Sequence, residues 1–180
     1  LFGAQGSPLW AYQTGDHITG IAISGDGRFI AASSFLGELY FLDVNGNLLW
    51  NRSRLGCDTR VFLTRDGLKG YVFNFLSSDN YYQFHPDGTI SPQKSIPHMI
   101  LGGLTPDGTY LVGEIRLFPA YNNDIVLLSE NGTILWRYTL PEVWYQNVAI
   151  SDDAHTIAAA TRSHGIYIFN RQGTLTATST

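Results

Sequence analysis

The feature that most constrains this chain is a glycine turn that recurs five times at nearly constant spacing. The five glycines, which are 40, 42, 44 and 41 residues apart, are Gly6, Gly46, Gly88, Gly132 and Gly173. Each follows Asn, Asp or Gln and precedes Ser, Asn or Thr. Such residues favour the positive φ angles of tight hairpins. A repeat of this length indicates stacked supersecondary units.

A second turn is interleaved with the first and keeps the same phase. Its four copies are centred on Asp26, Asp66, Asp107 and Asp153, each preceded two positions earlier by Ser or Thr. Between the two kinds of turn lie short runs rich in β-branched and aromatic residues. In the first repeat these are 21–23, 28–33, 38–42 and a run beginning at Leu48, and none has a helical period. Four short strands per repeat, here named a to d, form one blade of a β-propeller.

The sequence therefore predicts an all-β chain with four visible four-stranded propeller blades in a single domain. The blades are expected at about 15–53, 54–95, 96–139 and 140–180, and residues 1–14 supply an extra outer-strand segment. At 44% hydrophobic residues in 180, the chain can bury a core. The five glycine turns delimit only four complete repeats. The blades then belong to a larger ring, form a small closed ring, or are completed by another chain.

A tryptophan repeats with the glycine turn. The fourth residue after the glycine is Trp10, Trp50 or Trp136, whereas Pro92 and Ala177 stand at the other two positions. A large ring at a repeated position predicts packing between adjacent blades. Strand a of the first repeat is apolar at successive positions, which predicts a strand covered on both faces.

These motifs resemble those of the PQQ-like and WD-repeat-like β-propeller superfamily, of the surface or periplasmic type found in archaea and bacteria. The matching stretches are 18–27, 45–50, 131–138 and 148–153. The resemblance implies a propeller fold, with rings of typically seven or eight blades, but no particular activity. The Gly-His and Trp-Asp dipeptides of strict WD repeats are absent, and Cys57 is the only cysteine, whereas PQQ-dependent dehydrogenases carry adjacent cysteines and a calcium site. No cofactor is therefore expected.

The b–c and d–a connections share one end of the blades and vary in length, so a binding site is expected there. The stretches 77–82, 114–123 and 141–146 stand out because they combine aromatic residues with Arg, Asn or Asp. Such residues suit a protein or glycan ligand, although the same aromatic side chains are equally suited to capping the blades. The predicted binding residues are Tyr81, Arg116, Phe118, Tyr121, Trp144 and Tyr145.

Metal binding and catalysis are not predicted. His17, His98 and His164 fall at the same end as Cys57, but no two of these have the close spacing of a metal motif, and loop histidines in solvent are the simpler interpretation. No nucleophile elbow, phosphate loop or dinucleotide fingerprint occurs. Paired carboxylates of a propeller glycosidase would have to come from acids at that end of the blades, namely Asp16, Asp58, Asp79, Glu114 and Glu142.

The expected function is that of a noncatalytic scaffold that binds a protein, a glycan or copies of itself. In a homo-oligomer, residues 9–14 would be the strand that one copy donates to a blade of its neighbour. The formal net charge of −4 and the absence of a basic run exclude nucleic acid as an expected partner, and no apolar stretch predicts membrane insertion. Few charges, a Thr/Ser-rich end and the sequons at Asn51 and Asn131 predict an extracellular or cell-surface protein, with the periplasm as an alternative. The chain does not begin with Met, so it is expected to be a trimmed or excerpted piece. The alternatives are a structural subunit of a surface layer or filament, and a quinoprotein-like or glycan-active propeller enzyme.

Overall fold

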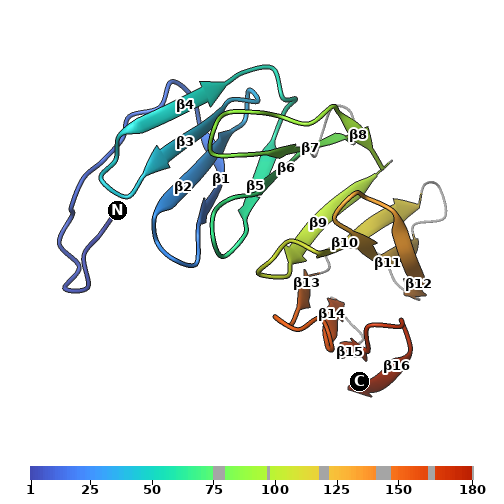
Figure 1. Ribbon diagram of the computed structural model, residues 1–180. Helices are drawn as coiled ribbons and strands as arrows, with labels where there is room; N and C mark the ends of the chain where they lie inside the picture. The colour runs from blue at the N-terminus through green and yellow to red at the C-terminus, as the bar shows by residue number, and fades with distance from the viewer. Residues whose placement is uncertain (75–79, 97, 118–121, 141–146, 162–164, 180) are drawn as a thin grey trace. The chain divides into compact units, whose positions relative to one another are not determined.

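A computed structural model describes residues 1–74, 80–96, 98–117, 122–140, 147–161 and 165–179 (Figure 1). All the helix or strand structure assigned in these residues is β-strand. The chain divides into two compact units, Leu1–Gln93 and Lys94–Thr180.

The first unit begins with a four-stranded antiparallel sheet in the order β1-β2-β3-β4. It continues with β5, β6 and β7 of a second sheet in the order β5-β6-β7-β8, whose last strand follows the boundary at Gln93. The first sheet contains β1 (Ile18–Ile23), β2 (Phe29–Ser34), β3 (Leu39–Asp43) and β4 (Leu48–Arg52). The second contains β5 (Thr59–Leu63), β6 (Gly70–Asn74), β7 (Asn80–Phe84) and the two-residue β8 (Lys94–Ser95).

The second unit contains two further antiparallel sheets, in the orders β9-β10-β11-β12 and β13-β14-β15-β16. The third sheet is built from β9 (Met99–Leu104), β10 (Tyr110–Leu117), β11 (Asn122–Ser129) and β12 (Ile134–Leu140). The fourth is built from β13 (Asn147–Ile150), β14 (Ile157–Thr161), β15 (Gly165–Phe169) and β16 (Leu175–Ser179). Each sheet is a meander of sequential strands, which confirms the prediction of four four-stranded propeller blades.

The two repeated turns are closed by their own side chains. In the first a–b turn, Oδ1 of Asp26 accepts hydrogen bonds from the Ser24 hydroxyl at 2.7 Å and from the Arg28 backbone N–H at 3.0 Å. In the first c–d turn, the Gly46 N–H donates to the Asp43 carbonyl, and Gly46 has a φ of 85°. That left-handed conformation explains why glycine returns at this position.

The aspartates of the a–b turns, which we call the turn aspartates, are Asp26, Asp66, Asp107 and Asp153. Hydrogen bonds from a Ser or Thr hydroxyl and from backbone N–H groups stabilise their charged forms. The pKa values of Asp26, Asp107 and Asp153 are lowered to about 2, and that of Asp66 is also lowered. The turns are therefore held most firmly when these carboxylates are ionised.

Each blade has two apolar faces, because residues of a strand alternate between them. We call the face that packs on the following blade the forward face, and the face that receives the preceding blade the rear face. In the first unit, Ala31, Leu39 and Phe41 on the forward face of the first blade share a core with Val61, Val72 and Phe84 on the rear face of the second. The second unit has an equivalent core, in which Val112, Ile125 and Leu127 meet Val148, Ala159 and Phe169.

The repeated tryptophan fastens the outer strand of one blade to the next blade. The indole N–H of Trp50 donates to the Pro86 carbonyl at 2.9 Å, and that of Trp136 donates to the Arg171 carbonyl at 2.8 Å. Each ring covers the next glycine turn closely. A methyl group on Gly88 would lie 3.4 Å from Cδ1 of Trp50. These contacts confirm that the repeated tryptophan packs between blades, and we call each such arrangement a tryptophan clip.

The prediction that strand a of the first repeat is covered on both faces is wrong. Ile21 and Ile23 of β1 are 68% and 53% exposed on the rear face of the first blade. The reason is that, within the first unit, residues 1–14 lie along β2 and β3 of this rear face and leave β1 open.

Candidate functional site

The candidate site begins with a hairpin at the amino terminus. Phe2 and Pro8 form an antiparallel bridge, and the Leu9 N–H donates to the Leu1 carbonyl at 3.0 Å. The amino group of Leu1 donates to the Trp10 carbonyl, also at 3.0 Å. Residues 1–10 therefore pair as the end of a strand c and the start of a strand d, with the first repeated glycine turn between them.

Trp10 anchors this hairpin on the rear face of the first blade. Its indole N–H donates to the Val44 carbonyl at 2.8 Å, and a methyl group on Gly46 would lie 2.7 Å from its Cδ2. The ring packs on a cluster that includes Ala32 and Leu42. Trp10 thus forms a third tryptophan clip, equivalent to those of Trp50 and Trp136.

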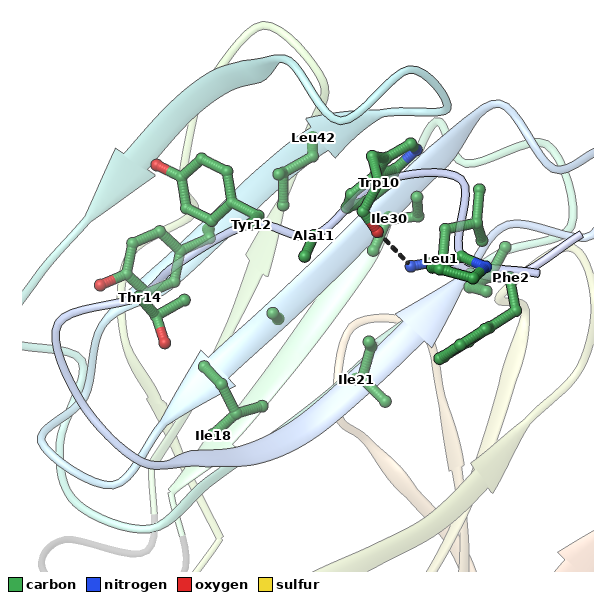
Figure 2. A pocket seen from close by; sticks show the side chains of 14 residues that line it. Leu1, Phe2, Trp10, Ala11, Tyr12, Thr14, Ile18, Ile21, Ile30 and Leu42 are labelled. Carbon is green, nitrogen blue, oxygen red and sulfur yellow. Dashed lines mark hydrogen bonds between the residues drawn. The ribbon is translucent and has the colours of Figure 1, made fainter. Parts of the chain in front are cut away.

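Between the hairpin and β1 lies an open groove of about 550 Å³ (Figure 2). Several of its side chains are well exposed, with Phe2 at 71% and Ile18 at 41%. No charged side chain lines it, and polar atoms come only from the tyrosine and threonine hydroxyls, the Trp10 indole and the backbone. The lining residues are Leu1, Phe2, Pro8, Trp10, Ala11, Tyr12, Thr14, Ile18, Ile21, Ile23, Ile30, Ala32, Tyr40 and Leu42.

The floor of the groove has the same positions in the repeat as a covered face elsewhere in the unit. Ile21 and Val61 each stand five residues before a turn aspartate, and Leu42 and Phe84 each stand four residues before a repeated glycine. Val61 and Phe84 are buried in the core between the first two blades. The floor of the groove is therefore the rear face of the first blade, and within the first unit the hairpin packs on part of it.

Of the predicted binding residues, the structure describes Tyr81 and Arg116, and neither lines the groove. Phe118, Tyr121, Trp144 and Tyr145 fall outside the described residues. Tyr81 is 3% exposed and stacks on Phe73 with ring centroids 4.8 Å apart, and its burial raises its pKa to about 12. Its ring is therefore not offered to a ligand in this structure.

Two of the predicted connections are shorter than expected. Asn80–Phe84 is strand β7, so 80–82 are not connection, and β10 and β11 extend through Leu117 and from Asn122. Arg116 is a strand residue paired with Asn123. The sequence did not indicate that these stretches are strands, because their polar residues interrupt the apolar alternation at the strand ends.

The candidate metal ligands are not brought together where they are described. His17 is exposed, with Nδ1 3.5 Å from Oδ1 of Asp16, and His98 is also exposed. His164 lies outside the described residues. Cys57 is half-buried beside Asn74, whose side chain accepts its backbone N–H at 3.2 Å. Within the described ranges, no three His, Cys, Asp or Glu side chains form a group that would hold a metal ion.

The candidate acids serve local structure where they are described. Oδ2 of Asp16 accepts the Leu36 backbone N–H at 2.7 Å, which contributes most to the lowered pKa of Asp16. Glu114 is buried and its Oε2 lies 3.5 Å from Nδ2 of Asn123. Asp58 has a φ of 51°, and Asp79 and Glu142 lie outside the described residues.

Sequence reasoning placed the candidate site at the loop end of the blades, whereas the groove lies on a blade face. The signal that could have located it was the repeat itself. Aligning Ile21 and Ile23 with Val61 and Leu63 identifies them as residues of a rear face, which in the second blade packs on its neighbour. No helix long and apolar enough to cross a membrane occurs in the described part of the chain.

Comparisons with known proteins identify the fold. No protein-family model matches the chain, and no curated protein matches its sequence. Among solved structures, dihydro-heme d1 dehydrogenase NirN in complex with DHE is similar with a TM-score of 0.69 and 18% identity, covering 98% of this chain and 40% of that one. Hydrazine synthase of Kuenenia stuttgartiensis is similar with a TM-score of 0.64 and 12% identity, covering 85% and 51%.

A third similar structure is the β-propeller domain of Cps50 (Swd1) from Myceliophteria thermophila. Its TM-score is 0.65 at 10% identity, covering 90% of this chain and 54% of that one. The chain thus spans between 40% and 54% of the solved chains. At such low identity these likenesses show the fold alone, and they include proteins named as enzymes beside a propeller domain that is not.

Proposed function

We propose that this β-propeller, whose motifs resemble those of the PQQ-like and WD-repeat-like superfamily, acts as a noncatalytic scaffold that binds through the open groove of its first blade. The observation that carries this proposal is the exposed apolar floor of the groove, where Ile21 is 68% and Ile23 is 53% exposed. Covering a contiguous apolar surface of this kind with another apolar surface lowers the free energy, because both are removed from water.

The chemistry of the groove favours a protein surface over a glycan. A sugar must keep its hydroxyl groups hydrogen-bonded when it leaves water, and side-chain donors and acceptors suited to this are few among the lining residues. An apolar protein surface has no such requirement. The aromatic loop residues Phe118, Tyr121, Trp144 and Tyr145 remain the proposed site for any glycan ligand.

Export of the protein to the cell surface or the exterior is also part of this proposal. Asn51 and Asn131 are exposed, so both sequons are accessible to modification. Localisation of the tagged protein in the parent organism tests this point separately from binding.

The groove is tested with a fluorescent apolar probe, 8-anilinonaphthalene-1-sulfonate. Native protein at low concentration is expected to enhance its fluorescence, and Ile23→Ser is expected to reduce the enhancement. Leu68→Ser is the matched control, because Leu68 is 50% exposed but lies outside the groove. Circular dichroism verifies that both variants keep their β structure. Equal probe binding by Ile23→Ser and the native protein would contradict the proposal.

A further inference from the structure

We propose that Asn45 is a site of spontaneous deamidation, and that its conversion loosens the tryptophan clip that Trp10 forms on the first blade. The reaction needs only water, so this inference does not depend on any ligand of the groove. It does bear on the shape of the groove, because the hairpin that Trp10 anchors supplies Leu1, Phe2 and Pro8 to the lining.

The chemistry follows from the residue that comes after the asparagine. The backbone nitrogen of that residue attacks the asparagine Cγ and closes a five-membered succinimide ring. The Cγ–Nδ2 bond breaks, and ammonia leaves with the proton of the attacking nitrogen. Glycine favours this step because it has no Cβ to obstruct the approach, and the two reacting groups are already held in one molecule. Water then opens the ring at either carbonyl, which gives aspartate or isoaspartate.

The chain contains two Asn-Gly pairs in equivalent positions of the repeat. They are Asn45-Gly46 in the first blade and Asn131-Gly132 in the third. Both asparagines are exposed, so water reaches each of them. What distinguishes the two pairs is how firmly the structure holds the reacting groups.

Asn131 is held by its own side chain. Its Oδ1 accepts hydrogen bonds from the Ser129 hydroxyl at 2.5 Å, the Thr133 hydroxyl at 2.9 Å and the Thr133 backbone N–H at 3.2 Å. The Lys94 ammonium donates to the Asn131 carbonyl at 2.9 Å. The three bonds to Oδ1 must break before the Cγ can turn towards the nitrogen of Gly132, so this pair is protected.

Asn45 stands in a turn that a different residue closes. Oδ1 of Asp43 accepts the backbone N–H groups of Asn45 and Asn47, both at 2.9 Å. The Asn45 amide also donates to this carboxylate, but it contributes less than Asn47 to the lowered pKa of Asp43. Within the described residues, no hydrogen bond to Oδ1 of Asn45 is found. The Asn45 side chain is therefore freer to react than that of Asn131.

Trp10 holds the residues on both sides of Asn45. Its indole N–H donates to the Val44 carbonyl at 2.8 Å, and its ring lies so close to Gly46 that a methyl group there would be 2.7 Å from Cδ2. The Gly46 N–H itself donates to the Asp43 carbonyl at 3.1 Å. The nitrogen can attack only after the turn opens locally beneath the ring, so the clip sets the rate of the reaction.

The products disturb the contacts that Trp10 makes. Either product places a second carboxylate close to Asp43, and the two like charges repel each other. Isoaspartate also adds one methylene to the main chain between Val44 and Gly46. The carbonyl and the glycine that the indole contacts then no longer have the spacing that the clip requires.

Peptide mapping by mass spectrometry tests the proposal on the native chain. The folded protein is kept at mildly alkaline pH, and the conversion of Asn45 and of Asn131 is followed in the same sample. Asn45 is expected to react about tenfold faster, since the bonds to Oδ1 of Asn131 together reduce its reactive population by at least that factor. In urea, where neither turn persists, the two rates should become similar.

Two substitutions test the two restraints separately. Trp10→Phe keeps a ring at the clip position but removes the indole donor, so it should speed the reaction at Asn45 and leave Asn131 unchanged. Thr133→Val removes one donor to Oδ1 of Asn131 and should speed that site alone. Asn45→Gln is the unreactive control, because its longer side chain would have to close a six-membered ring.

Hydrogen exchange measures the effect on the hairpin. The amides of Gly3 and Leu9 donate within the hairpin, and a two-stranded hairpin is hardly stable without a surface to pack on. Both amides should exchange faster in the deamidated protein than in Asn45→Gln kept for the same time, whereas amides of β6 should not change. If Asn131 reacts as fast as Asn45 in the folded chain, the site is wrongly assigned. Unchanged exchange after conversion of Asn45 would refute its effect on the clip.

Discussion

Replacing Trp50 by alanine tests the tryptophan clip most directly. The ring stacks on Phe41 with centroids 5.0 Å apart, meets Phe84 edge-on at 5.7 Å, and donates its N–H to the Pro86 carbonyl. Truncating a buried Trp to Ala costs about 3–5 kcal/mol. Because Trp50 is half-buried, we expect a loss of about 3 kcal/mol, at the lower end of that range.

A second substitution at the same position divides this loss into its parts. Trp50→Phe keeps an aromatic ring against Phe41 but removes the N–H donor, which costs about 1 kcal/mol for the hydrogen bond. The remainder of the Trp50→Ala loss belongs to packing. A surface control such as Leu36→Ala should stay within about 0.5 kcal/mol of the native protein.

Native-state hydrogen exchange is the suitable assay because it resolves the two units. Amides of β3, β4 and β7 should exchange about 100-fold faster in Trp50→Ala, since about 1.4 kcal/mol corresponds to a factor of ten. Amides of 94–180 should be unchanged. An effect below about 1 kcal/mol, or one spread evenly over both units, would refute the clip as the local fastener of the first two blades.

Three further changes test other parts of the structure. Gly70→Ala should destabilise the first unit by more than about 1 kcal/mol, the cost of overpacking, because its methyl group would lie 2.0 Å from Cζ of Phe84. Gly15→Ala is the control and should be nearly neutral, because the space around Gly15 is open. Urea unfolding measures both variants. Trp136→Ala should speed hydrogen exchange in 94–180 and leave the first unit unchanged. The turn aspartates have folded-state pKa values below 3.8, so their stabilisation is complete above about pH 4 and is lost as the pH falls towards 2. Acid unfolding monitored by circular dichroism should therefore shift to higher pH when one of them is replaced by Asn, and an unshifted curve would count against these turn contacts.

The strands and turns were predictable because two independent turn signals keep one phase along the chain. Gly46 requires a positive φ and Asp26 closes its own turn, so both positions can be read without knowledge of the fold. The strand run predicted at 38–42 differs from β3 by one residue at each end. Local backbone chemistry was sufficient for this part of the structure.

Exposure was not predictable from the same signals. An apolar strand such as β1 has the same sequence pattern whether or not a neighbouring sheet covers it, so Ile21 gave no sign of lying open. The error for Tyr81 was the reverse, because this residue was predicted to be exposed in a loop but is buried. Its polar neighbours suggested a loop, whereas it lies inside β7. Burial depends on which surfaces meet, and this is decided by contacts between blades.

The tryptophan clips have a mechanical consequence. Trp50 and Trp136 each fasten two blades within a unit through an indole hydrogen bond to the next blade. Under a stretching force applied across one unit, its two blades should therefore resist rupture together. The two-blade pair, not the single blade, is then the smallest piece that bears load as a whole.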